Sequence, residues 1–125
     1  MGGSLVIKLT LPYPPTSNHN TMVAHGRRIS SPTYRKWRAA AEAVCIEGCL
    51  LQFDAPLKGP YWIAYVVDRP DRRRRDIENL PKSISDALQS AGVIEDDSFC
   101  MQSICEWSQR APGKGAAVHV TITAW

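Results

Sequence analysis

The segment Gly59-Pro-Tyr-Trp-Ile-Ala-Tyr-Val-Val67 is rich in β-branched and aromatic residues. Such residues favour the β-strand, and a strand this apolar is expected inside a sheet and not at its edge. The following residues, Asp68-Arg-Pro70, end it, because proline lacks the N–H that a strand ladder needs. We therefore predict a central strand over 59–67 and arrange the other elements around it.

A helix is predicted on the C-terminal side of this strand. Pro81 would clash with the carbonyl four residues earlier if it lay in the interior of a helix. We therefore expect the regular helix to begin near Glu78, with Pro81 in or next to its first turn. Gly92 suits the position just after the helix, which favours the left-handed conformation. The apolar residues at helical spacing are Ile77, Leu80, Ile84, Ala87, Leu88 and Ala91.

The remaining elements surround this strand–helix unit. Ser31-Pro32 is a good N-cap and N1 pair for a helix over 32–51. The resulting order, β-β-β-α-β-α-β-β, indicates an α+β fold in which a mixed β-sheet carries two main helices packed on one face. The other predicted elements are strands at 4–11, 98–107 and 117–124 and a small hairpin over 22–30 that turns near Gly26.

Length and composition indicate an ordinary globular protein. The chain has 125 residues, of which 44% are hydrophobic and 22% charged, so we expect one domain over residues 1–125. We find no apolar run long enough to span a membrane and no signal peptide, and we expect a cytoplasmic protein. The spacing of the four cysteines favours reduced, mostly buried thiols over a zinc site; they are Cys45, Cys49, Cys100 and Cys105.

The charges after the central strand divide sharply. Residues 69–75 contain five arginines and one aspartate, whereas residues 76–97 contain six acids and one lysine. Arginines attract phosphate and carboxylates repel it. The two patterns are compatible if the carboxylates hold a divalent cation that binds the same phosphate. The net charge of +3 for the whole chain suits a polyanionic partner without identifying it. We predict a metal-dependent enzyme that acts on the nucleic-acid backbone.

The candidate metal ligands lie at both ends of the predicted second helix. Asp76 and Glu78 precede it, and the run Glu95-Asp-Asp97 follows it. To share one cation, the chain after the helix must fold back along it and bring Asp97 beside Asp76. Magnesium suits such a site, because it takes oxygen ligands from one or two carboxylates plus water and phosphate. Lys82 lies four residues beyond Glu78, where it can neutralise charge on the phosphate.

A purely structural interpretation of the same residues stays open. Glu78 and Lys82 also suit an ordinary surface ion pair, and the four arginines suit a solvated loop. The rigid Pro14-Pro15 bend, with Asn18 beyond it, either lines a DNA cleft or simply ends the first strand.

Several motifs occur in order across nearly the whole chain. They are Leu11-Pro-Tyr-Pro-Pro-Thr-Ser-Asn18, Asp71-Arg-Arg-Arg-Arg-Asp76-Ile-Glu78-Asn79-Leu80 with Lys82, Asp86-Ala-Leu88, and Glu95-Asp-Asp97-Ser98. Together they resemble the RusA family, the Holliday-junction resolvases of bacteria and their prophages. The resemblance implies a homodimeric endodeoxyribonuclease that resolves four-way DNA junctions by paired symmetric nicks in recombination and repair. It implies Mg2+ as cofactor with Mn2+ able to replace it, no organic cofactor, no membrane partner, and a bacterial cytoplasm, nucleoid-associated or prophage-encoded.

The same resemblance assigns the site residues. The family's metal ligands fall on Asp76, Glu78 and Asp97, and its catalytic lysine falls on Lys82; these four form the expected catalytic set. Two positions depart from the family pattern: the second acid is usually aspartate and here is Glu78, and Pro81 stands where a helix former is expected. The expected DNA-binding residues are Arg72, Arg73, Arg74 and Arg75, with Asn18 as a further candidate.

A homodimer also has a physical rationale, because two incisions related by two-fold symmetry need two equivalent sites.

Two other functions stay open from the sequence. One is a protein that binds branched DNA without cutting it because Glu78 has spoiled the metal site. The other is a metal nuclease of broader structure selectivity, since phosphate contacts alone do not select a DNA structure. Candidate interface aromatics are Tyr61, Trp62, Trp107 and Trp125, although core packing is expected for most of them.

Overall fold

The computed structural model describes residues 5–15, 21–52 and 56–125. Along the chain the elements are β1 (Val6–Pro12), β2 (Thr21–Ala24), β3 (Arg27–Ser30), α1 (Pro32–Gln52), β4 (Tyr61–Val67), η2 (Ile77–Asn79), α2 (Leu80–Ser90), η3 (Asp97–Phe99), β5 (Cys100–Trp107) and β6 (Ala117–Ala124). The order of strands and α-helices confirms the predicted pattern. The short 3₁₀ helices η2 and η3 are additions, one immediately before α2 and one before β5.

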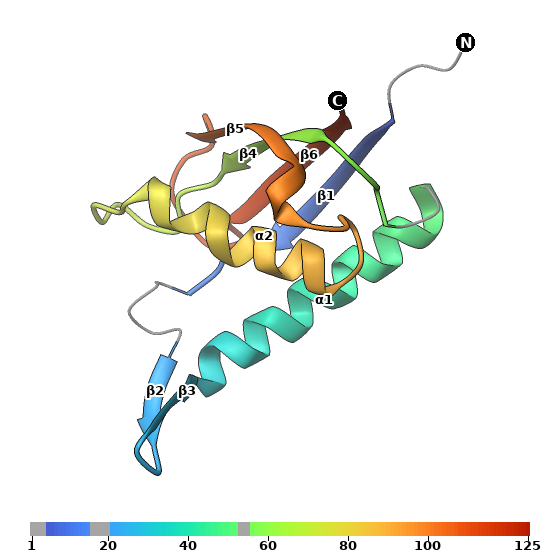
Figure 1. Cartoon of the computed structure of the whole chain (residues 1–125). Coiled ribbons are helices and arrows are strands. Elements are labelled where there is room, and N and C mark those ends of the chain that lie inside the picture. Colours follow the sequence, from blue (N-terminus) through green and yellow to red (C-terminus); the bar gives the residue numbers. More distant parts are fainter. Residues whose placement is uncertain (1–4, 16–20, 53–55) are drawn as a thin grey trace.

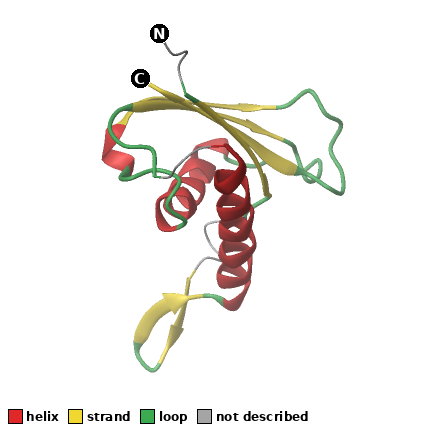
Figure 2. Cartoon of the chain, turned by 90° about the vertical axis from the view of Figure 1, so that its right-hand side faces the viewer, coloured by secondary structure: helices red, strands yellow, loops and turns green. Residues whose placement is uncertain are grey.

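Four strands form one mixed sheet in the order β1-β6-β4-β5. β4 pairs in parallel with β5 and antiparallel with β6, and β1 pairs antiparallel with β6. The prediction of an inner strand at β4 is thus confirmed. Figures 1 and 2 show α1 and α2 on one face of this sheet, which confirms the predicted α+β arrangement. Within the described residues β5 pairs with β4 alone and forms one edge of the sheet.

The hydrophobic core lies between the sheet and the two helices. Alternate residues of β4 point into it, so Tyr61 is 1% exposed, whereas Trp62 on the other face is half-buried. Trp37 of α1 is buried there too and donates from Nε1 to the carbonyl of Pro12 at 2.8 Å. Burying side chains of this size stabilises the fold by about 1.5–3 kcal/mol each. Of the other interface candidates, Trp107 is half-buried and Trp125 remains 65% exposed.

The ends of α2 follow the local sequence signals. Pro81 lies in the first turn, where its missing N–H costs no helical hydrogen bond. At the other end Gly92 adopts φ of +79°, a conformation that glycine reaches without strain. The place of Pro81 in the first turn and the end before Gly92 are confirmed, but the regular helix begins at Leu80 and not near Glu78, which lies in the 3₁₀ helix η2. No helix in the described residues is both long and apolar enough to cross a membrane.

The predicted hairpin is present and projects away from the rest of the protein (Figures 1 and 2). Its strands β2 and β3 pair antiparallel. The two residues between them, His25 and Gly26, both have positive φ, 52° and 74°. Two consecutive residues of this kind give the tight turn that matches the twist of a two-stranded hairpin. Asn18, a predicted DNA-binding residue, lies outside the described residues.

Candidate functional site

The arginine-rich loop between β4 and η2 is held in shape by an internal ion pair. Asp71 accepts the N–H of Arg73 at 3.0 Å and both Nε and Nη2 of Arg75, at 3.2 and 2.7 Å. The hydrogen bond from Arg75 is the main reason that the pKa of Asp71 lies below its usual value. The guanidinium of Arg75 also lies over the ring of Tyr13, 5.8 Å from its centre. Arg75 therefore has a structural role in this loop, which the sequence did not predict.

The other three arginines of the run are placed differently. Their side chains are exposed, and none takes part in an ion pair within the described part of the chain. Guanidinium groups in this state are ready to contact phosphate oxygens. The three are Arg72, Arg73 and Arg74.

A hollow of about 370 Å³ lies between this loop and the proline-rich segment after β1. Tyr13, Pro14 and Pro15 line one side of it, and residues 73–76 line the other together with Asn79. The proline bend thus does more than end β1, because it forms a wall beside the arginines. The sequence did not predict that Tyr13 lines this hollow. Its one local signal was its place between Pro12 and Pro14.

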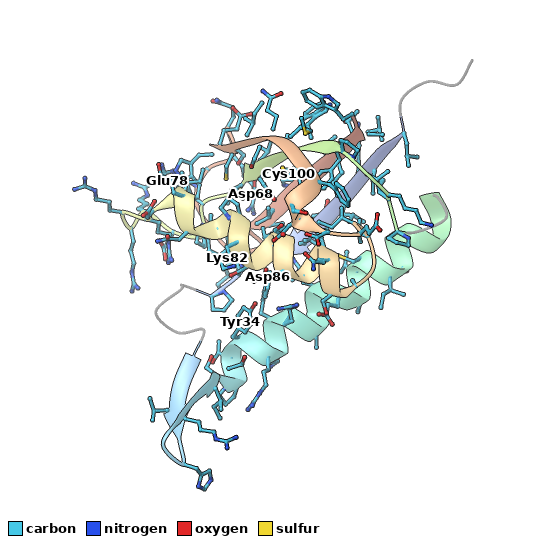
Figure 3. All side chains as sticks on the ribbon, in the orientation of Figure 1. Tyr34, Asp68, Glu78, Lys82, Asp86 and Cys100 are labelled. Atoms are coloured by element: carbon cyan, nitrogen blue, oxygen red, sulfur yellow. The ribbon has the colours of Figure 1, made fainter. Side chains whose placement is uncertain are left out.

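Asp76 and Glu78 lie together at the N-terminal end of α2. Asp76 caps η2, accepting the N–H of Glu78 at 3.0 Å and the side-chain amide of Asn79 at 3.3 Å. This cap explains why Asp76 stands there, since an aspartate satisfies the free N–H groups of a helical turn. Each oxygen of Asp76 keeps further lone pairs, and the side chain of Glu78 is exposed at this end of the molecule (Figure 3). Two exposed carboxylates thus stand two residues apart in the chain at the start of α2.

Lys82 lies one turn further along α2 and is 84% exposed. Its Nζ is 3.9 Å from Oδ2 of Asp86, the only ion pair that Lys82 makes among the described residues. The alternative of a Glu78–Lys82 surface pair is therefore wrong. Such an exposed pair with Asp86 contributes little to stability, so the ammonium group is free to turn towards a bound phosphate. Figure 3 shows the three side chains spaced along the helix.

Asp97 lies at the opposite end of α2. Its N–H donates to Oε1 of Gln89, in the last turn of that helix, at 3.1 Å. The chain before Asp97 is held there by Leu57, whose N–H donates to Val93 and whose carbonyl accepts from Glu95. The expected return of the chain along the helix is therefore wrong.

The length of α2 sets the gap between the predicted metal ligands. The helix has 11 residues, which corresponds to about 16 Å. Within the described ranges no three His, Cys, Asp or Glu side chains come close enough to share a metal ion. One chain thus brings Asp76 and Glu78 together but leaves Asp97 apart from them.

A buried carboxylate at the end of β4 anchors the base of the arginine loop. Asp68 is 4% exposed and accepts from Ser108 Oγ at 2.6 Å, from the N–H of Ala117 at 3.1 Å and from His119 Nε2 at 3.1 Å. Burial alone raises the pKa of Asp68, but these hydrogen bonds outweigh it and lower the pKa. The cluster joins the ends of β4, β5 and β6. The sequence showed Asp68 only as the end of a strand.

One cysteine lies next to the start of α2, because Sγ of Cys105 donates to the carbonyl of Ile77 at 3.9 Å. None of the three described cysteines is in a disulfide, in line with the predicted reduced thiols, but only Cys45 is buried and Cys100 and Cys105 are half-buried. Burial raises the pKa of Cys105 to about 11, so this thiol stays protonated at neutral pH. The side chain of Cys49 lies outside the described part of the structure.

Comparison with known proteins gives a consistent result. The family model described as Endodeoxyribonuclease RusA matches residues 12–123. A crossover junction endodeoxyribonuclease of Enterobacteria phage 82 is 38% identical over 116 residues, 92% of each chain. The corresponding protein of Escherichia coli K12 is 37% identical over the same share, and that of phage HK97 is 34% identical over 72% of each chain. The order of motifs, the exposed acids and arginines at the start of α2 and these matches agree, and the chain belongs to the RusA family of endodeoxyribonucleases.

Proposed function

We propose that this protein cleaves four-way DNA junctions by paired nicks, as a homodimer that depends on a divalent metal ion, in the bacterial cytoplasm. The observation that carries the proposal is the grouping of Asp76, Glu78 and Lys82 at one end of α2, beside exposed arginines. The names of the relatives, crossover junction endodeoxyribonucleases, support the choice of substrate.

The metal ligands come from two chains. Mg2+ binds oxygen ligands at about 2.0–2.1 Å, so carboxylates separated by a helix of about 16 Å cannot share one ion. Asp76 and Glu78 of one chain therefore need Asp97 of a second chain. The donor set is entirely carboxylate oxygen, which suits Mg2+ and also Mn2+.

The edge strand β5 supports this assembly. The start of α2 lies towards the end of β5, because the carbonyl of Ile77 accepts from Sγ of Cys105 at 3.9 Å. Asp97 lies just before the start of β5, at Cys100. If two β5 strands pair antiparallel about a two-fold axis, the end of each lies beside the start of the other. This pairing moves Glu78 of one chain towards Asp97 of its partner.

The surface of β5 is also suited to pairing. It has one neighbour in the sheet, and its other edge presents unpaired backbone groups, which monomeric proteins usually protect. Large apolar side chains are exposed on and just before it: Met101 is 56% and Ile104 45% exposed in β5, and Phe99, at the end of η3, is 37% exposed. Burying these side chains against a second copy favours association.

Each group then has a defined task. When bound, Mg2+ polarises a phosphate oxygen and lowers the pKa of a coordinated water. Lys82 neutralises charge that develops on the phosphate as the bond breaks. Arg73 and Arg74 hold the flanking phosphates against the wall formed by the proline bend.

A labelled four-way junction tests the proposal. The wild-type protein should release paired nicks with Mg2+ or Mn2+, and Asp76→Asn or Asp97→Asn should bind the junction without cutting it. Glu95→Gln, which removes a neighbouring exposed acid, is the matched control and should keep its activity. Equal cleavage of flap, duplex and junction would show a broader nuclease, and cleavage by both asparagine variants would overturn the ligand assignment.

A further inference from the structure

The N-terminal third of the chain carries a second basic surface that the cleavage site does not use. Residues 1–41 contain six lysines and arginines and no acid. Three of the six, Arg27, Arg35 and Lys36, are exposed, and none of them enters an ion pair with any described residue. By contrast, Arg38 forms an ion pair with Glu42, with Nε 2.8 Å from Oε1. The three exposed cations lie on β3 and the first turn of α1.

The β2–β3 hairpin that carries Arg27 stands apart from the rest of the protein, as Figures 1 and 2 show. Isolated two-stranded hairpins are only marginally stable in water. Its apolar Val23 is 67% exposed. A two-stranded ribbon of this kind fits the major groove of a DNA duplex. Its shape and charge thus match a nucleic acid.

The basic surface is continuous with the arginine loop. A second hollow, of about 420 Å³, lies between the proline-rich segment and the start of α1, where Lys36 lines it. Tyr13, Pro14 and Pro15 line this hollow as well as the one beside Arg73. The width of one short segment therefore separates Lys36 from the arginine loop.

We propose that the β2–β3 hairpin and the first turn of α1 bind one duplex arm of the DNA junction, away from its branch point. The proposal rests on the proposed function, in which the arginine loop holds the DNA near the cleaved strand. Arg27, Arg35 and Lys36 contact backbone phosphates along the arm. The absence of acids up to residue 41 leaves no charge on this segment that repels them.

The size of the hairpin sets the added length of the DNA contact. Strands of four residues are about 13 Å long, which equals about 4 base pairs of duplex. Junctions whose arms are cut back by this length should lose the contact, while longer arms retain it.

The test measures junction binding without metal, which prevents cleavage, between 50 and 200 mM salt and with long or short arms. The variants are Arg27→Ala and the double variant Arg35→Ala/Lys36→Ala. Lys58→Ala is the control, because Lys58 is exposed beyond the far end of α1. Circular dichroism establishes that each variant is folded.

The wild type and Lys58→Ala should bind long arms more tightly than short ones, and the variants should lose this preference. Each phosphate contact adds about 0.9 to the slope of log affinity against log salt. From 50 to 200 mM salt the affinity of the double variant should therefore fall by a factor about ten times smaller than the factor for the wild type. Variants that keep the wild-type slope and arm-length preference would overturn the inference while leaving the proposed function intact. A wild type that binds no junction would overturn both.

Discussion

Because Asp97 lies apart from Asp76 and Glu78, we predict that two inactive variants restore activity when they form a dimer with each other. One chain carries Asp76→Asn and the other carries Asp97→Asn, and each variant alone should be inactive. In a dimer that contains one chain of each kind, both substitutions fall in the same composite site. The other site combines the intact Asp76 of one chain with the intact Asp97 of the other, so activity should return.

The expected amount follows from the geometry. The helix of 11 residues holds the two ends about 16 Å apart, so neither variant can complete a site within its own chain. Each mixed dimer has one of its two sites intact, so isolated mixed dimers should contain about half of the wild-type sites. Random exchange makes about half of the dimers mixed, so the unfractionated mixture should contain about a quarter. Each mixed dimer should nick one strand only, and the paired incisions that resolve a junction should be absent.

The assay uses two different affinity tags to isolate mixed dimers, followed by denaturing gels for nicks and native gels for resolved products. A reciprocal dimer is the control: Asp76→Asn/Asp97→Asn in one chain with a wild-type partner, which damages both composite sites. If the reciprocal dimer cuts and the first mixed dimer does not, each site lies within one chain and the reasoning is refuted.

Asp68→Asn should lower the melting temperature by about 5–15 °C, because it weakens a buried charge-assisted network that contributes about 2–3 kcal/mol. Since hydrogen bonds lower the pKa of Asp68, that contribution is complete above its unfolded pKa of about 3.9 and is lost as pH falls through the folded value. Melting curves should therefore differ at neutral pH and converge in strong acid, below the folded pKa of Asp68; equal melting at pH 7 would contradict the network. Arg75→Lys keeps the charge but loses the two-pronged contact with Asp71, so junction affinity should fall with little change in salt slope, whereas Lys58→Arg, at an exposed lysine outside the proposed DNA contacts, should change neither. A lower slope for Arg75→Lys would show that Arg75 contacts phosphate directly. Mg2+ at about 100 times its Kd should stabilise the dimer by about 2.7 kcal/mol, seen as a rise in melting temperature that Asp97→Asn abolishes; an equal rise in that variant would place the ion elsewhere.

Local signals in the sequence accounted for most of the fold. β4 was visible from its aromatic and β-branched residues, and the end of α2 from Gly92, because these preferences act within a few residues. The turn at Gly26 was visible for the same reason. In each case the physical cause lies inside the segment itself.

The failures concern contacts between distant segments. Asp97 was expected beside Asp76, but hydrogen bonds between Leu57 and the chain around Val93 hold it at the other end of α2. The composition of neither segment indicates that Leu57 pairs with the chain around Val93. Asp71 was counted among the charges of the run, yet its bond to Arg75 removes that arginine from the group free to meet phosphate. The sequence thus predicted which acids and arginines belong to the site. Which of them lie together, and which form structural ion pairs, could be seen only in the folded structure.

The distance that α2 keeps between Glu78 and Asp97 has a consequence for control of the enzyme. If the site is shared between two chains as proposed, a solitary copy holds an incomplete set of ligands and should not cut DNA. When monomers predominate, the concentration of dimers, and with it the rate of cleavage, should grow with the square of the protein concentration. A modest change in expression should therefore change the cleavage rate steeply. Under the same proposal, dilution below the dimer dissociation constant should stop cleavage.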